Sequence, residues 1–280
     1  GVKGFIDDSD SAGITTLGAS TFSEWFKFDT VSFPNITTLD KGHEFYVAPF
    51  TSIGDDINKK GNSGYGYFPN LKTIENCENT FRQLGYGRGH WGRPNVSLVG
   101  ASGTNPGDAG TGEDHRGETL LSVDSSTLTD LWGGHLFYHN KELKSVNLSN
   151  VVSLRKLDAS TGQPVTAATG NTAAAAYGYN QFHTCYKLKT VNMPKLKYGG
   201  YGTFAHANMS HISSDVSGEG YGYFPQLTDV PTYMFYGQDT ESGQYQTLKT
   251  VDLPLVTEVW FQSFYHNKGL YSVKMNKLEE

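Results

Sequence analysis

The chain repeats a short phrase in which apolar residues stand at positions 1, 4 and 6, with polar residues between them. Clear copies are Leu143–Leu148, Leu188–Met193, Leu248–Leu253 and Leu270–Met275. In an extended strand, positions 4 and 6 point to one face and the residue between them points to the other. Each phrase therefore predicts a short strand with one buried and one solvated face. A proline after several copies, such as Pro194 or Pro254, ends the strand because proline donates no backbone hydrogen bond.

The phrase recurs at a nearly constant interval. Val251 and Val273 are 22 residues apart, and Val123 and Val146 are 23 apart. A period of about 20–29 residues is typical of leucine-rich repeats, in which stacked units bury a continuous core. We read Leu71–Ile74 and Leu227–Val230 as degenerate copies of the strand phrase. A phenylalanine also recurs once per unit, at Phe45, Phe81, Phe137, Phe204, Phe235 and Phe264.

These intervals predict one repeat domain over residues 1–280, with about eight imperfect units of 22–23 residues. Residues 85–118 and 158–179 hold no sustained period and are rich in small residues, so we predict two loop insertions. A solenoid tolerates insertions because each unit contacts only its neighbours. The string Gly-Tyr-Gly-Tyr-Phe-Pro occurs twice, at 64–69 and 220–225, which suggests a long-range duplication.

The unit Leu248–Leu270 resembles the BspA-type leucine-rich repeats, whose units read Leu-x-x-Ile-x-Leu-Pro, then Leu-x-x-Ile, then Phe-x-x-Cys-x-x-Leu. Phe182–Leu188 carries the cysteine form of the last segment, with Cys185 where other units have Asn140 or Asn267. We expect the residue at this corner to turn inward and bond backbone groups. The resemblance implies a β-rich solenoid with short parallel strands and irregular or short helical return segments. It also implies an extracellular module of the bacterial cell surface that adheres to a host or neighbouring-cell protein or glycan.

Composition narrows the class of function. The 22 Lys and Arg against 28 Asp and Glu give a net charge of −6 without a basic run, so we expect no nucleic-acid partner. No stretch approaches the roughly 18 apolar residues that a membrane span requires, so we expect no direct membrane insertion. The motifs Gly-x-Ser-x-Gly and His-Glu-x-x-His and a phosphate loop are all absent from the sequence. We therefore expect a non-catalytic module without cofactor or bound metal.

Two other functions stay open at this point. One is a carbohydrate-acting enzyme with its site in the 85–118 insertion, and the other is a passive structural spacer. Asp108, Glu113 and Asp114 in the same insertion would suit a calcium loop, although their spacing matches no standard one.

The recurring histidines and tryptophans have a structural interpretation. Three histidines each stand two residues after a repeat phenylalanine, so we expect them to stack along the array rather than to bind metal. They are His139, His206 and His266. Trp132 and Trp260 each follow an aliphatic residue at the same place in the unit, and we interpret both as packing residues.

Two surfaces are candidate binding sites. Tyr86, His90 and Trp91 lie in the first insertion, where an aromatic side chain either contacts a partner or folds back over the solenoid. The residues that follow the repeat valine or isoleucine should form a polar column on the strand face: Ser32, Glu75, Asp124, Asn147, Asn192, Asp252 and Lys274. From this column we predict Asp124, Asn147, Asn192 and Asp252 as binding residues of a flat docking surface. The alternative is a solvated sheet face without a partner.

Overall fold

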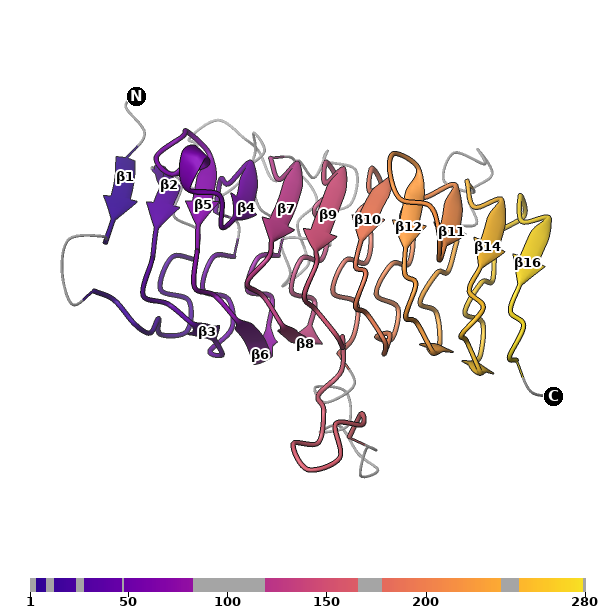
Figure 1. Cartoon of the computed structure of the whole chain (residues 1–280). Helices are drawn as coiled ribbons and strands as arrows, with labels where there is room; N and C mark the ends of the chain where they lie inside the picture. Colours follow the sequence, from indigo (N-terminus) through magenta and orange to yellow (C-terminus); the bar gives the residue numbers. More distant parts are fainter. Residues whose placement is uncertain are drawn as a thin grey trace, which may run out of the picture.

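The computed structural model describes residues 4–8, 13–23, 28–46, 48–82, 119–165, 178–237 and 247–278. These residues wind into an elongated solenoid with a long parallel sheet along one side (Figure 1). The sheet has eleven strands, in the spatial order β1 (Gly4–Asp7), β2 (Phe28–Ser32), β5 (Tyr65–Tyr67), β4 (Ser52–Gly54), β7 (Ser122–Ser125), β9 (Ser145–Leu148), β10 (Thr190–Asn192), β12 (Tyr221–Tyr223), β11 (His211–Ser213), β14 (Thr250–Asp252) and β16 (Ser272–Lys274).

A second row of strands runs along the opposite side of the solenoid. It consists of β3 (Thr38–Leu39), β6 (Thr73–Glu78) and β8 (Asp130–Gly134), and farther along of β13 (Asp229–Val230) and β15 (Glu258–Val259). Parallel bridges through Ser153 and Tyr198 connect the two groups. The described residues contain one helical segment, the 3-10 turn η1 (Ile57–Lys59), and no helix long and apolar enough to cross a membrane. The expected fold, a β-rich repeat solenoid with irregular return segments, is confirmed.

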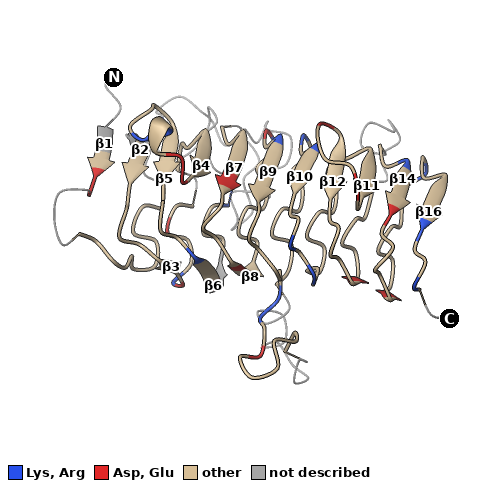
Figure 2. Ribbon diagram, in the orientation of Figure 1, with Lys and Arg blue, Asp and Glu red and all other residues tan. Residues whose placement is uncertain are grey.

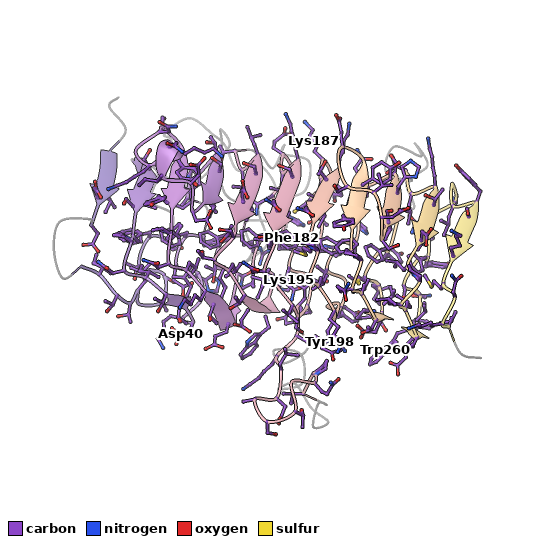
Figure 3. All side chains as sticks on the ribbon, viewed as in Figure 1. Asp40, Phe182, Lys187, Lys195, Tyr198 and Trp260 are labelled. Atoms are coloured by element: carbon purple, nitrogen blue, oxygen red, sulfur yellow. The ribbon has the colours of Figure 1, made fainter. Side chains whose placement is uncertain are left out.

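Phenylalanine rings form a continuous spine between the two sheets, where Figure 3 shows Phe182. Seven successive ring pairs stack with centroids 5.0–5.9 Å apart and interplanar angles of at most 15°. The spine phenylalanines are Phe22, Phe45, Phe81, Phe137, Phe182, Phe204, Phe235 and Phe264. Each ring is large, and each unit places it at the same depth, so one residue per repeat fills the centre of the core.

The corner residues turn inward as the sequence predicted. The Asn140 amide donates to the carbonyl oxygens of Phe81 and Phe137 at 2.9 and 2.8 Å. Asn267 makes the equivalent pair of bonds at the last unit. The Cys185 thiol donates to the Phe137 carbonyl at 3.4 Å. These side chains satisfy backbone carbonyls that the turn leaves without a strand partner.

The two degenerate copies of the strand phrase were assigned to the wrong sheet. Ile74 and Val230 lie in β6 and β13, which belong to the second row, so Glu75 is not part of the polar column on the long sheet. In the long sheet the corresponding places are taken by Gly66 and Gly222, in β5 and β12. Both strands are missing a core side chain at the position where other units have valine, which is why the phrase is difficult to recognise.

Each copy of Gly-Tyr-Gly-Tyr-Phe-Pro contributes one strand to a parallel pair whose order in the sheet is the reverse of its order in the chain. We call these two pairs the reversed strand pairs. Strand β5 follows β4 in the chain but precedes it in the sheet, and β12 precedes β11 in the same way (Figure 1). The core position of each extra strand is narrow. A Cβ on Gly66 would lie 3.0 Å from the Phe68 ring, and a Cβ on Gly222 would lie 2.7 Å from the Phe224 ring. Because glycine has no side chain, the ring of the phenylalanine two residues later fills this part of the core.

The described part of the predicted 158–179 insertion contains a short hairpin. Leu157 and Pro164 form an antiparallel bridge, and the Asp158 carboxylate accepts hydrogen bonds from the backbone N–H groups of Ser160 and Thr161, both at 2.9 Å. The hairpin projects from the side opposite the long sheet (Figure 1). The 85–118 insertion lies outside the described residues.

The two tryptophans differ. Trp132 is 8% exposed and packs as predicted, beneath the ammonium of Lys156. Trp260 is 44% exposed and lies in the last unit, with no described unit beyond it to supply the cover that Lys156 gives Trp132, so its packing stays a prediction. Its indole N–H donates to Glu258 in the same short segment, at the lower edge of the solenoid in Figure 3.

Candidate functional site

The four predicted residues of the strand face lie in one column of the long sheet. The register aligns Asp124 of β7 with Asn147 of β9, and Asn147 with Asn192 of β10. Asp252 of β14 lies farther along the sheet, beside Lys274 of β16. Figure 2 shows the acidic ends of β7 and β14 and the basic end of β16. The structure therefore brings three of the four residues into contact and leaves Asp252 apart from them.

Hydrogen bonds within the column occupy these side chains. The Asn147 amide donates to the Asp124 carboxylate at 2.8 Å, and the Asn192 amide donates to the Asn147 carbonyl oxygen at 2.7 Å. The Lys274 ammonium lies 3.0 Å from the Asp252 carboxylate. Strand-face side chains thus bond neighbouring units from β7 through β9 to β10, and again between β14 and β16. This geometry favours a stabilising ladder over a docking surface.

The turns that carry the spine phenylalanines form a second surface, which the sequence pattern does not indicate. Two residues before each spine phenylalanine, the backbone adopts a left-handed conformation with φ between 52° and 61°. These residues are Ser20, His43, Asn79, His135, Asn180, Gly202, Tyr233 and Gln262. The conformation costs about 1–2 kcal/mol for a residue other than glycine. It directs the phenylalanine N–H to the next unit, as from Phe137 to the Gln181 carbonyl at 2.7 Å.

Ring-bearing and guanidinium side chains that stand one or two places after a spine phenylalanine form what we call the aromatic ridge: Arg82, Tyr138, His139, His183, His206, Tyr236, Tyr265 and His266. The Arg82 guanidinium lies 4.8 Å from the Tyr138 ring centroid. Rings then follow one another along successive units: Tyr138–His183 at 5.3 Å, His183–His206 at 4.9 Å, His206–Tyr236 at 5.6 Å and Tyr236–Tyr265 at 5.9 Å. The predicted stacking of the three repeat histidines is confirmed, because His139 and His266 also pack on tyrosine rings.

A groove of about 270 Å³ opens in the ridge. Its lining residues come from several units: Asn180, His183, Tyr201, Ala205, His206, Tyr233, Tyr236 and Gln262. Tyr201 is 40% exposed and meets Tyr233 edge to face with ring centroids 5.4 Å apart. Tyr233 meets Tyr236 in the same manner at 5.4 Å. The groove thus has aromatic walls and carries amide and imidazole groups.

Two imidazoles of the groove carry buried polar atoms without a partner. The Nδ1 atoms of His183 and His206 are buried and form no hydrogen bond. Burial, and then the neighbouring His206, lower the pKa of His183 to about 3. Burial also lowers the pKa of His206, with a smaller contribution from His266. Both rings are therefore neutral at pH 7, and each Nδ1 offers either a donor or an acceptor, depending on the tautomer.

Two of the described carboxylates and the Cys185 thiol take part in contacts that stabilise the fold. Asp55 accepts hydrogen bonds from Ser126 and Thr127. Asp229 is buried and bonds Arg155 and the Gly199 N–H; burial raises its pKa, and Arg155 offsets part of this effect. Burial raises the pKa of the Cys185 thiol, which disfavours the nucleophilic thiolate. In the ranges that the structure describes, no three His, Cys, Asp or Glu side chains converge as a metal site would require.

The predicted aromatic residues of the first insertion, Tyr86, His90 and Trp91, lie outside the described residues, as do Asp108, Glu113 and Asp114. Their role as binding or calcium residues stays a prediction.

The repeating unit now has three defining parts. It has a Leu-x-x-Val phrase whose last two residues begin a parallel strand, a phenylalanine at the centre of the core, and an Asn or Cys corner bonded to backbone carbonyls. The described residues form a β-rich repeat solenoid whose units carry a leucine-rich-repeat pattern. No family model matches the sequence, and no curated protein matches it either.

Two solved structures are similar to the solenoid at low identity. A leucine-rich repeat protein from Bacteroides ovatus is 12% identical, with a TM-score of 0.26, over 96% of this chain and 56% of that protein. A leucine rich cell surface protein from Faecalibacterium prausnitzii is 12% identical, with a TM-score of 0.21, over 98% of this chain and 82% of that protein. The solenoid spans little more than half the length of the Bacteroides protein.

Proposed function

We propose that this solenoid is a non-catalytic recognition module of the bacterial cell surface, and that it binds a protein or glycan through the groove in the aromatic ridge. One observation carries the proposal: a groove of about 270 Å³ is lined by three tyrosines, two histidines and two side-chain amides, and one of the tyrosines, Tyr201, is 40% exposed.

The rest of the groove supports recognition. Exposed aromatic side chains such as Tyr201 provide contact area with little loss of side-chain freedom on binding. Pockets that bind ligands combine apolar walls with a few directed polar groups, and here Asn180 and Gln262 supply amides beside the tyrosines. The resemblance of the repeat units to the BspA type supports an extracellular location.

Catalysis has less support. A glycosidase requires two carboxyl groups about 5–9.5 Å apart across a sugar site, and no Asp or Glu lines the groove. The enzyme alternative thus depends on the 85–118 insertion, and the spacer alternative depends on the absence of any ligand.

A binding screen separates these functions. The solenoid is tested by biolayer interferometry against extracellular-matrix proteins and on a glycan array. It is compared with Tyr201→Ala/Gln262→Ala in the groove, Asn147→Ala/Asn192→Ala on the strand face, and a variant with residues 85–118 replaced by a Gly/Ser linker. We expect a ligand that the groove variant binds at least about tenfold more weakly, equivalent to about 1.4 kcal/mol, while the other two variants retain it.

Melting temperatures of all variants serve as the folding control. Binding that only the strand-face variant loses would move the site to the polar column. Binding that only the linker variant loses would move it to the insertion, where turnover would then be assayed. If neither the unmodified solenoid nor any variant bound a ligand, the result would favour the function of a passive structural spacer.

A further inference from the structure

We propose that the groove takes a neutral saccharide: one pyranose unit of a linear glycan whose neighbouring units lie along the aromatic ridge. This inference rests on the proposed function and names the ligand class for the same site.

The groove carries no formal charge. None of its eight lining residues is Lys, Arg, Asp or Glu, and the lowered pKa values keep His183 and His206 neutral at pH 7. Phosphate and carboxylate ligands are usually held by Arg or Lys, and the groove provides neither residue. An acidic or basic peptide would likewise leave its charge unpaired, which is costly in a partly buried site. The lining therefore selects an uncharged ligand.

The shape suits a single sugar ring. Pockets for larger small molecules measure about 300–1,000 Å³, and this groove measures about 270 Å³. A pyranose ring has an apolar face of C–H groups and an edge of hydroxyl groups. Tyr201 and Tyr233 stand nearly perpendicular to one another, at 88°. One of these rings can lie against the C–H face while the other bounds the side of the sugar.

The polar groups match hydroxyls better than they match a peptide. A sugar hydroxyl both donates and accepts, so it pairs with a side-chain amide through either the amide N–H or the amide oxygen. Asn180 and Gln262 line the groove with such amides. The rings of His183 and His206 line it as well, with centroids 4.9 Å apart, while their Nδ1 atoms are buried away from solvent.

The ridge continues beyond the groove in both directions. Tyr138 lies one unit before His183, at 5.3 Å, and Tyr265 lies one unit after Tyr236, at 5.9 Å. Tyr265 is exposed. A linear glycan laid along the ridge meets one ring in each repeat, so each added sugar unit gains one further contact. A monosaccharide uses the groove alone.

The test uses the whole solenoid on an array of neutral and acidic glycans. The neutral glycan that binds best is then titrated by calorimetry as a series from one to six sugar units. We expect neutral glycans to bind in preference to hexagalacturonate, with affinity that rises with length. Tyr201→Ala should weaken every member of the series at least about tenfold. Tyr265→Ala should weaken only the longer members, and Asn192→Ala on the strand face should leave all of them unchanged.

Several results would overturn the inference. If hexagalacturonate bound as tightly as the neutral glycans, the groove would not select uncharged ligands. If affinity did not rise with the number of sugar units, the aromatic ridge would not be part of the binding site. A protein ligand that is lost in Tyr201→Ala, with no saccharide bound, would refute the saccharide and leave the proposed function standing. Saccharide binding that Tyr201→Ala does not change would refute the groove itself, and the proposed function with it.

Discussion

Tyr65 and Tyr221 occupy the same position in the two reversed strand pairs, β4–β5 and β11–β12, but their surroundings differ. Tyr65 is 3% exposed, and its hydroxyl accepts a hydrogen bond from the Asp56 N–H at 3.0 Å. Tyr221 is partly exposed and stacks on His211 with ring centroids 4.8 Å apart. The backbone registers agree, since Tyr65 is aligned with Ser52 and Tyr221 with His211.

The loop inside each pair produces the difference. In the first pair, residues 55–64 lie over the sheet and bond Thr30 of β2 through the Asn62 carbonyl and the Gly64 N–H, at 3.1 and 3.2 Å. In the second pair, the shorter loop 214–220 bonds back to its own strand, because the Ser213 hydroxyl accepts from the Asp215 and Val216 N–H groups. One strand topology thus carries a covered face in the first half and an open face in the second, according to where the loop finds its hydrogen bonds.

The largest effect is expected from exchanging the residues that end β4 and β11. A Cβ on Gly54 would lie 2.2 Å from the backbone oxygen of Asp124 and 2.8 Å from the Tyr65 hydroxyl. Since the backbone cannot yield cheaply, Gly54→Ser should lower the free energy of unfolding by about 3 kcal/mol. The matching change Ser213→Gly removes the loop bonds and should cost only about 1 kcal/mol. Urea unfolding of both variants measures the difference, and equal losses would show that the two pairs do not differ here.

A smaller effect is expected at the glycines in the core of the extra strands. Gly222→Ala brings a Cβ to 2.7 Å from both the Phe224 ring and the Met209 sulfur, whereas Gly66→Ala meets the Phe68 ring at 3.0 Å. Overpacking of this kind costs about 1–3 kcal/mol, and we expect Gly222→Ala to be the more destabilising of the two. Thermal melts of the two single variants test the order. A reversed order would mean that the second pair yields more easily than its contacts indicate.

These glycines also explain which parts of the fold the sequence predicts. The strands with Val146, Val191 and Val251 are recognisable because an apolar side chain marks each buried position. In β5 and β12 the buried position is Gly66 or Gly222, and the residue that fills the space is the phenylalanine two places later. Periodicity therefore detects the strand in most units and misses it where a neighbour supplies the core atoms.

The groove cannot be predicted from the sequence pattern, for a different reason. Its residues, such as Asn180, Tyr201 and His206, come from different units and occupy different positions relative to the spine phenylalanine. One usable signal existed: Asn and His recur two places before that phenylalanine, and both tolerate the left-handed backbone found there. Which side chains meet across neighbouring units depends on the stacking of the repeats, and a linear pattern does not show it. The strand-face column was predictable because it needs only the alternation within one strand.

The smallest effect is expected at the two tyrosine hydroxyls themselves. Tyr65→Phe leaves the Asp56 N–H without its acceptor and should cost about 1 kcal/mol, whereas Tyr221→Phe should change the free energy of unfolding very little. Burial raises the pKa of Tyr65 from 10.0 to about 12. Between these two pH values the unfolded chain loses this proton and the folded chain keeps it, so the contribution of Tyr65 to stability is complete below pH 10 and is lost as the pH rises toward 12.

Urea unfolding at pH 7, 10 and 11.5 measures both consequences. The wild-type protein and Tyr221→Phe should lose stability in parallel as the pH rises, while Tyr65→Phe should lose less, because it has no hydroxyl to ionise at this position. Parallel curves for all three proteins would show that the 55–64 loop does not shield Tyr65 from solvent. The two strand pairs would then differ in loop length alone, and the contrast between a covered and an open face would not hold in solution.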